Sequence, residues 1–209
     1  MSLGFFYKIA DFFGRYVFSK IRKPHPIIKK EISLISSDCL GGIILHEEQK
    51  RFLTPTINLY FNADDFVKFV LNLNYYLSIK PKPFPTKEKY PVLLLDDIKL
   101  FCVHYKSFEE AIEKWVERKK RIIDNNIVIL MSDRNGFTDE TYNNFLNIPY
   151  PKILLTCNPK FTIDSVLVKK YAQANCIGDL SKYTFFGKRR VITISLQKRI
   201  NQLLNEGRA

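Results

Sequence analysis

Residues 32 to 46 read Ile32-Ser-Leu-Ile-Ser-Ser-Asp-Cys-Leu-Gly-Gly-Ile-Ile-Leu-His46, and the rest of the chain can be interpreted outward from them. The β-branched run 32–36 predicts a strand, and residues 41–51 have helical spacing. A strand that enters a helix through small polar residues leaves the first helical N–H groups unpaired and directed at whatever binds there. The turn at residues 36–42 is therefore the first predicted site, and its candidate binding residues are Ser37, Asp38, Cys39, Gly41 and Gly42.

Runs that predict strands begin near residues 32, 56, 98, 127 and 153, with helical patterns between them. Intervals of roughly 25 to 40 residues are typical of βαβ crossover units. The sequence therefore predicts an α/β fold with an open, mostly parallel sheet and helices on both faces, in a three-layer Rossmann-like arrangement. In such sheets, ligands bind at the carboxyl ends of the strands.

Composition sets the broad class. The chain has 209 residues, of which 46% are hydrophobic, enough for one α/β domain, which we place at residues 31–209. The net charge of +12 favours an anionic partner: a phosphorylated sugar, a nucleotide, a nucleic acid or an acidic membrane surface. The four cysteines are dispersed, which argues against a zinc ribbon or a disulfide framework and favours the reducing cytoplasm. The sequence has neither a long apolar run nor a signal-peptide pattern, which favours a soluble or peripheral protein.

Residues 1–30 are expected to form a separate N-terminal element. Aromatic and aliphatic side chains fall on one helical face of residues 1–24, and basic side chains fall on the other. Such a helix can lie on an anionic membrane, or it can dock its aromatic face on the protein's own core or on a second subunit. Lys23-Pro-His-Pro26 then ends the helix.

Polar turns follow most of the predicted strands, and a parallel sheet would bring them to one edge. Asp133 directly follows the apolar run 127–131 and is the candidate catalytic acid or base, beside Arg134, which can clamp an anion. The alternative is an ordinary turn in which Asp133 bonds to its own backbone. If Asp133 is catalytic, Asp133→Ala should abolish activity and leave the melting temperature nearly unchanged. The other candidates of this edge are His104 for catalysis and Asn58, Asn135, Gly136, Asn158 and Asp179 for binding.

Two other kinds of chemistry have weaker support. Cys39 at a helix start is either a nucleophile of lowered pKa, with His104 as its base in a hydrolase, or a small buried residue. Asp96-Asp97 is similar to the Asp-x-Asp pair with which glycosyltransferases hold a divalent metal, but it lacks that spacing and also fits a turn. No other cluster has metal-ligand spacing, so a divalent cofactor is unsupported and the cofactor stays open.

The basic patches at 114–121 and 188–190 are better explained as solvated charged faces than as a nucleic-acid site, because no aromatic side chains alternate with the charges.

Five ordered segments together resemble one bacterial domain family of unknown function that is commonly labelled exopolysaccharide biosynthesis protein. They lie between residues 32 and 187: Ile35-Ser-Ser-Asp-Cys-Leu-Gly-Gly-Ile-Ile44, Thr54-Pro-Thr-Ile-Asn-Leu-Tyr-Phe61, His104-Tyr-Lys-Ser-Phe-Glu-Glu-Ala111 with Trp115 and Arg118-Lys-Lys-Arg-Ile122, Asp133-Arg-Asn-Gly136, and Asn175-Cys-Ile-Gly-Asp179. The resemblance implies a cytoplasmic role in making capsule or surface polysaccharide, with glycosyltransferase-like chemistry. It assigns no catalytic residues.

The sequence thus leads to one main hypothesis and one rival. The main hypothesis is a protein, cytoplasmic or peripheral on the inner face of the cell membrane, that binds a phosphorylated or nucleotide-linked sugar at the strand ends. The rival is a non-catalytic partner of the same pathway that docks on a membrane or another enzyme. Reaction type, sugar donor and acceptor, and oligomeric state stay open.

Overall fold

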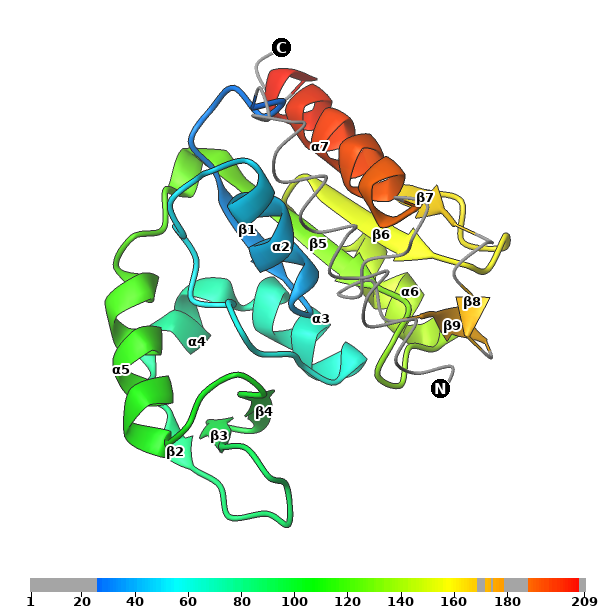
Figure 1. The fold of residues 1–209 in the computed structure, drawn as a ribbon. Coiled ribbons are helices and arrows are strands. Elements are labelled where there is room, and N and C mark those ends of the chain that lie inside the picture. The colour runs from blue at the N-terminus through cyan, green and yellow to red at the C-terminus, as the bar shows by residue number, and fades with distance from the viewer. Residues whose placement is uncertain (1–25, 169–171, 174, 179–187, 207–209) are drawn as a thin grey trace, which may run out of the picture.

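The central element is the strand β5 (Ile127–Ser132), whose six residues are all buried. In the computed structural model, which describes residues 26–168, 172–173, 175–178 and 188–206, β5 lies between two parallel neighbours. These are β1 (Ser33–Ser36) and β6 (Lys152–Thr156), and β7 (Ser165–Leu167) extends the sheet beyond β6 (Figure 1). The strand predicted at 127–131 is confirmed. Its wholly apolar sequence suits a strand that is covered on both faces.

Alternate residues of β5 enter two different hydrophobic cores, as the strand period of two requires. Val128 and Leu130 pack in the core that contains Ile44 of α2 (Leu40–Glu47) and Leu196 of α7 (Lys188–Glu206). Ile129 and Met131 belong to the other core. That core is filled from α3 (Ala63–Leu71), α4 (Leu73–Ser78), α5 (Phe108–Lys119) and α6 (Asp139–Leu146) by large side chains that include Phe66, Phe69, Tyr76, Trp115 and Phe145.

A second, antiparallel sheet corrects one prediction. The strands β2 (Lys82–Pro83), β3 (Val92–Leu95) and β4 (Ile98–Phe101) form it, so the run that begins at residue 98 does not join the parallel sheet. Asp96 has a left-handed φ of 58°, and Asp96-Asp97 makes a two-residue hairpin turn between β3 and β4. A connection this short can join only antiparallel strands.

The strand predicted at residues 56–61 is also wrong. This segment makes only an isolated bridge, Tyr60 with Phe101, and has no strand of its own. Asn58 has a φ of 64°, which interrupts the extended backbone that a strand needs. The β-branched and aromatic composition of the segment matched a strand, but tertiary contacts decide its path: the Tyr105 hydroxyl donates to the Ile57 carbonyl, and Phe61 N–H donates to Ser37 O.

Local capping determines where two helices begin. Ser107 accepts a hydrogen bond from Glu110 N–H at the start of α5. Thr138 and Thr141 form a reciprocal capping box at the start of α6. Both caps are as the sequence predicts, because a serine or threonine oxygen satisfies one of the unpaired N–H groups of the first turn.

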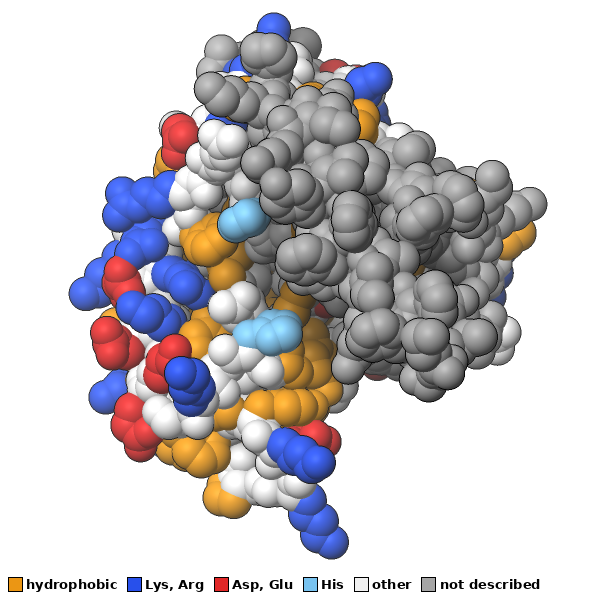
Figure 2. All heavy atoms as spheres, in the orientation of Figure 1, with side chains coloured by type: hydrophobic (Ala, Val, Ile, Leu, Met, Phe, Trp, Pro, Cys, Tyr) orange, Lys and Arg blue, Asp and Glu red, His pale blue; other side chains and the backbone are white. Residues whose placement is uncertain are grey.

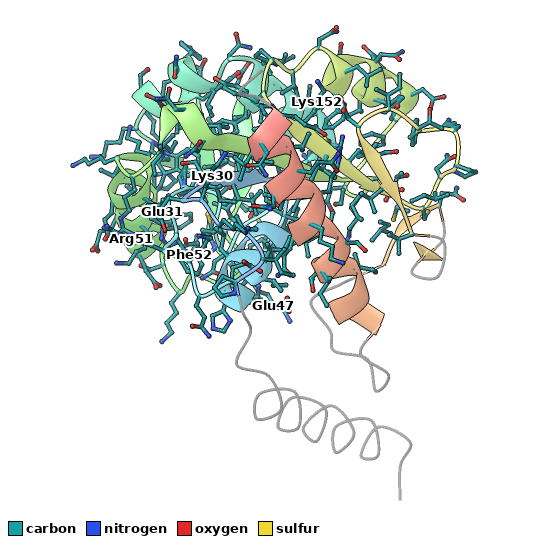
Figure 3. All side chains as sticks on the ribbon, turned by 90° about the horizontal axis from the view of Figure 1, so that it is seen from above. Lys30, Glu31, Glu47, Arg51, Phe52 and Lys152 are labelled. Carbon is teal, nitrogen blue, oxygen red and sulfur yellow. The ribbon has the colours of Figure 1, made fainter. Side chains whose placement is uncertain are left out.

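The last described helix, α7, is fixed to the segment that precedes β1. Lys29 N–H donates to the Asn201 side chain, and the Lys30 ammonium donates to the Leu204 carbonyl. Figure 3 shows α7 crossing the molecule with Lys30 beside it. The remaining described elements are η1 (Asp124–Asn126), which leads into β5, and the short pair β8 (Ala172–Gln173) and β9 (Cys176–Ile177).

The architecture is thus a mixed α/β fold with a parallel four-stranded sheet, a separate antiparallel sheet and helices packed in two cores. The predicted basic helix of residues 1–24 lies outside the described residues. Within the part of the chain that the structure describes, no helix is both long enough and apolar enough to cross a bilayer.

Candidate functional site

A pocket of about 400 Å³ opens at the carboxyl ends of β1 and β5, where the sequence predicts the site. We call it the strand-end pocket. Five of the predicted site residues line it: Asp38, Cys39, His104, Arg134 and Asn135. Asp38 and Cys39 arrive from the turn after β1, Arg134 and Asn135 from the turn after β5, and His104 from the loop after β4. The predicted convergence of distant turns therefore holds for these five.

Asp38 joins two of these turns. Its Oδ1 accepts from Leu40 N–H at 2.9 Å, at the start of α2, and its Oδ2 accepts from the Ser132 hydroxyl at 2.7 Å. Ser37 is buried, and its hydroxyl oxygen accepts from Ser132 N–H at 3.2 Å. Ser37 therefore links β1 to β5 and lies behind the pocket wall, whereas the Asp38 carboxylate faces the pocket with acceptor capacity left.

Arg134 and His104 are the basic side chains that line the strand-end pocket. Arg134 is half-buried and His104 is exposed, and neither side chain makes a hydrogen bond or an ion pair with any described residue. A guanidinium without a protein partner at the rim of a pocket is available to bind a carboxylate or phosphate through two parallel hydrogen bonds. The backbone N–H of His104 donates to the Asn58 carbonyl at 3.3 Å, and this bond fixes the loop that follows β4.

Cys39 lies in the same pocket, and its Sγ contacts the Leu59 carbonyl at 3.8 Å. It is half-buried. The nucleophile hypothesis stays a prediction.

The Asp133 carboxylate lies in a buried hydrogen-bond network. The residue is only 5% exposed, and its carboxylate accepts three hydrogen bonds of 2.8 Å, from the Thr156 hydroxyl, Cys157 N–H and Ile177 N–H. These bonds tie the end of β5 to the end of β6 and to β9. This network favours a structural role, and it reverses our expectation that Asp133→Ala would leave the melting temperature unchanged.

Asn135 and Gly136 shape the turn after β5. Both have left-handed φ values, 57° and 86°. The Asn135 amide donates to Phe61 O, and its backbone carbonyl accepts from Ala63 N–H. The turn therefore holds the first residues of α3, and Asn135 reaches the strand-end pocket as part of this contact.

Gly41 and Gly42 are explained by packing. A Cβ on Gly41 would lie 2.6 Å from the Ser36 Cβ, so this glycine lets α2 approach β1 closely. A Cβ on Gly42 would meet only Ile57, at an ordinary 3.6 Å. Neither glycine lines the strand-end pocket, so their predicted role in letting a ligand approach the backbone has no geometric support.

A second hollow of about 560 Å³ lies at the ends of β5 and β6. We call it the β6-end hollow. Asp133 and Asn158 line it, so the structure separates these two predicted residues from the other five. Asn58 lines neither cavity, and Asp179 lies outside the described residues.

Tyr60 and Ser132 line the strand-end pocket and were not among the predicted site residues. The Tyr60 ring stacks on Phe101 with centroids 4.6 Å apart, and its hydroxyl lies 3.1 Å from that of Tyr90. Burial and the hydrogen bond raise the pKa of Tyr90 well above its usual value. Ser132 is the last residue of β5, and its position at a strand end is the signal that would have found it.

Asp96 and Asp97 lie in the hairpin of the antiparallel sheet, and neither lines the strand-end pocket. The Tyr75 hydroxyl donates to Asp96, and Lys68 and the Tyr76 hydroxyl donate to Asp97, which holds the pKa of Asp97 below its ordinary value. These contacts support the turn interpretation. Among the described residues, no group of three or more His, Cys, Asp or Glu side chains is arranged to hold a metal ion.

The basic face of α5 is mixed with acids. Lys114 and Arg121 both pair with Glu117, and Figure 2 shows Lys and Arg side chains interspersed with Asp and Glu on the α5 side of the molecule. Such pairs are typical of a solvated helix surface.

Residues 11–201 match the family described as Domain of unknown function (DUF1919). A protein of Haemophilus influenzae, whose name is "Uncharacterized protein", is 34% identical over 156 residues, which cover 73% of this chain and 75% of that protein. The expected membership of a family of unknown function is confirmed. Neither description names a reaction, a substrate or a link to exopolysaccharide biosynthesis.

Proposed function

The chain belongs to the family described as Domain of unknown function (DUF1919), and from this premise we propose that its strand-end pocket binds a phosphorylated or nucleotide-linked sugar. The observation that carries the proposal is the Arg134 guanidinium, which lies in the wall of a pocket at parallel strand ends without a partner among the described residues. An anion that enters the pocket gains a bidentate partner, and no ion pair between described residues has to break. The pocket volume of about 400 Å³ lies within the range of small-molecule sites.

The other residues of the pocket suit the uncharged part of such a ligand. The Asp38 carboxylate and the Asn135 side chain offer oxygens to sugar hydroxyls, and the half-buried Tyr60 ring offers an apolar surface. His104 is exposed at the rim and is our candidate for moving a proton.

The reaction that fits this arrangement is glycosyl transfer. An acceptor hydroxyl oxygen bonds to the anomeric carbon of the sugar while the bond from that carbon to the phosphate oxygen breaks. The phosphate oxygen keeps the electron pair and gains stabilisation from Arg134, and the hydroxyl proton passes to His104. The electrostatic stabilisation that Arg134 provides is then greatest when the leaving phosphate carries its full charge.

The experiment is a calorimetric titration of the full chain with nucleotide sugars, with and without manganese. We expect Arg134→Gln to weaken binding by about 10- to 100-fold, since a hydrogen-bonded charge pair contributes about 1.5–3 kcal/mol. The control is Arg51→Gln, which changes an exposed arginine that, like Arg134, has no partner among the described residues; Arg51 is distant in the chain and labelled in Figure 3. Equal affinity for the two variants would remove Arg134 from the proposal.

We further infer that the fold is a three-layer Rossmann-like arrangement. The two cores on opposite sides of β5, one with α2 and α7 and the other with α3 to α6, support this inference. The described strand order, β1-β5-β6-β7, runs in one direction along the chain and contains no reversal. The pocket lies at the ends of β1 and β5 and extends to Leu155 of β6, and His104, which follows β4, lines it from the side of the antiparallel sheet.

We propose a place in exopolysaccharide or capsule assembly from the resemblance of the five segments quoted above. A tether to an anionic membrane through residues 1–24 is a separate proposal with its own test. Deletion of those residues should abolish sedimentation with vesicles that contain phosphatidylglycerol, and undiminished sedimentation would exclude the tether.

A further inference from the structure

The β6-end hollow adjoins the strand-end pocket, and three chain segments separate the two. Along each segment, neighbouring residues line different cavities: Asp133 and Arg134, Cys157 and Leu155, and Asn175 and Ile177, where the first residue of each pair faces the β6-end hollow. The Asp133 carboxylate holds these segments together through Cys157 N–H and Ile177 N–H. The two cavities thus lie on opposite sides of a wall that these three segments form.

The two cavities differ in electrostatics. In the strand-end pocket, Arg134 has no partner among the described residues. In the β6-end hollow, Lys160 pairs with Asp139, and the Asp133 carboxylate accepts three hydrogen bonds from neutral donors. The one cation in the described wall of the β6-end hollow is thus already paired, and two carboxylates disfavour an anion, so this hollow suits an uncharged ligand.

The wall of the β6-end hollow combines aromatic and amide groups. Phe137 and Phe161 form an edge-to-face pair with ring centroids 5.3 Å apart. Asn158 uses its Oδ1 to accept from Lys160 N–H at 3.1 Å, and its amide NH₂ makes no hydrogen bond to a described residue. Asn175 is exposed beside it. Apolar rings and a few convergent amide groups are what an uncharged sugar requires, since it has an apolar C–H face and a rim of hydroxyls.

We propose that the β6-end hollow binds an uncharged sugar, the acceptor of the transfer reaction, with Asn158 and Asn175 holding its hydroxyls. The role of this sugar as the acceptor rests on the proposed function. A transferase must hold its donor and its acceptor a short distance apart, as these two adjoining cavities would. The volume of about 560 Å³ accommodates a sugar unit.

The test uses three uncharged probes: methyl glucoside, methyl galactoside and the methyl glycoside of N-acetylglucosamine. Their binding to the full chain is measured by saturation-transfer NMR and titration. Asn158→Asp keeps the oxygen that caps Lys160 N–H but removes the amide donor, and Asn175→Ala removes an exposed amide. Asn143→Ala on α6 is the matched control, because Asn143 is exposed and lines neither cavity.

We expect at least one probe to bind the wild type and Asn143→Ala equally, and three- to tenfold more weakly to Asn158→Asp and to Asn175→Ala. Binding of no probe to the wild type, or equal binding to all four proteins, would overturn the proposal. Displacement of a bound probe by a nucleotide sugar would also overturn it, because one ligand would then fill both cavities.

The same samples separate this proposal from the proposed function. If nucleotide sugars bind through Arg134 and no glycoside binds, the acceptor site is wrong and the donor site stands. If glycosides bind through Asn158 and no nucleotide sugar binds, the β6-end hollow is a sugar site and the transferase proposal fails.

Discussion

Replacing Asp133 by alanine should destabilise the protein strongly. The substitution removes both oxygens of a carboxylate that is 5% exposed and accepts hydrogen bonds from Thr156, Cys157 and Ile177. Thr156 and Ile177 are buried, so after the change the Thr156 hydroxyl and the Ile177 N–H lose their acceptor and have little access to water as a replacement. The cost of an unsatisfied buried donor is what dominates such substitutions.

The magnitude follows from these three bonds. A hydrogen bond to a charged group contributes about 1.5–3 kcal/mol, but bonds that share one acceptor group are not additive. We therefore expect Asp133→Ala to lower the free energy of unfolding by about 3–5 kcal/mol, and the melting temperature by about 6–20 °C for a chain of this length. Asp133→Asn keeps one accepting oxygen and should have about half this effect.

The assay is urea unfolding followed by circular dichroism, with Asp139→Ala as the control. Asp139 follows on the same segment, its side chain is 71% exposed, and it pairs with Lys160 at the surface, so its loss should change stability by less than about 1 kcal/mol. A change of under about 1 kcal/mol for Asp133→Ala would refute the structural role. Activity of any Asp133 variant should be compared only at equal folded fractions, because unfolding alone lowers it.

Three further predictions concern other parts of the molecule. Gly41→Ala should destabilise the protein by about 1–3 kcal/mol, because the new Cβ would overlap Ser36. Gly42→Ala should stabilise it by about 0.5–1 kcal/mol, because alanine favours the helix and its Cβ would meet only Ile57. Thermal unfolding of the two variants checks both predictions. Burial raises the pKa of Asp65, so its folded form binds a proton more tightly than the unfolded chain does. The contribution of Asp65 to stability should therefore fall as pH rises from about 3.8 through the folded pKa. In urea titrations from pH 3 to 7, the wild type should lose stability relative to Asp65→Asn as the pH rises. Burial raises the pKa of Cys102 to about 12, so iodoacetamide should leave this thiol unlabelled in the folded protein at neutral pH, and rapid labelling by mass spectrometry would contradict its burial.

The parts of the fold that the sequence predicts are those with a local cause. The strand β5 is a continuous apolar run, and the helices α5 and α6 start at Ser107 and Thr138, which cap their own first turns. The segments 56–61 and 98–101 could not be assigned in the same way. Their composition suits a strand, but the choice of partner depends on Asn58 and on the hairpin at Asp96, both of which have left-handed backbones that composition does not encode.

The candidate site was predictable in place but not in detail. Carboxyl ends of parallel strands indicated Asp38, Cys39 and Arg134, and the structure brings them to one pocket. His104 reaches the same pocket from the other sheet, through a strand of opposite type to the one expected. Asp133 and Arg134 are neighbours that line different cavities, because adjacent residues at a strand end point to opposite sides.

The pairing of β1 with β5 has a consequence for synthesis on the ribosome. Ser132 N–H and the Ser37 hydroxyl are 95 residues apart in the chain, so the first strand waits for nearly half of the polypeptide before its neighbour emerges. Contacts at such separation are slow to form, whereas the hairpin β3–β4 needs only adjacent residues. The nascent chain should therefore fold its hairpin region first and hold the strand Ser33–Ser36 unpaired, with Leu34 and Ile35 open to a chaperone, until translation passes residue 132.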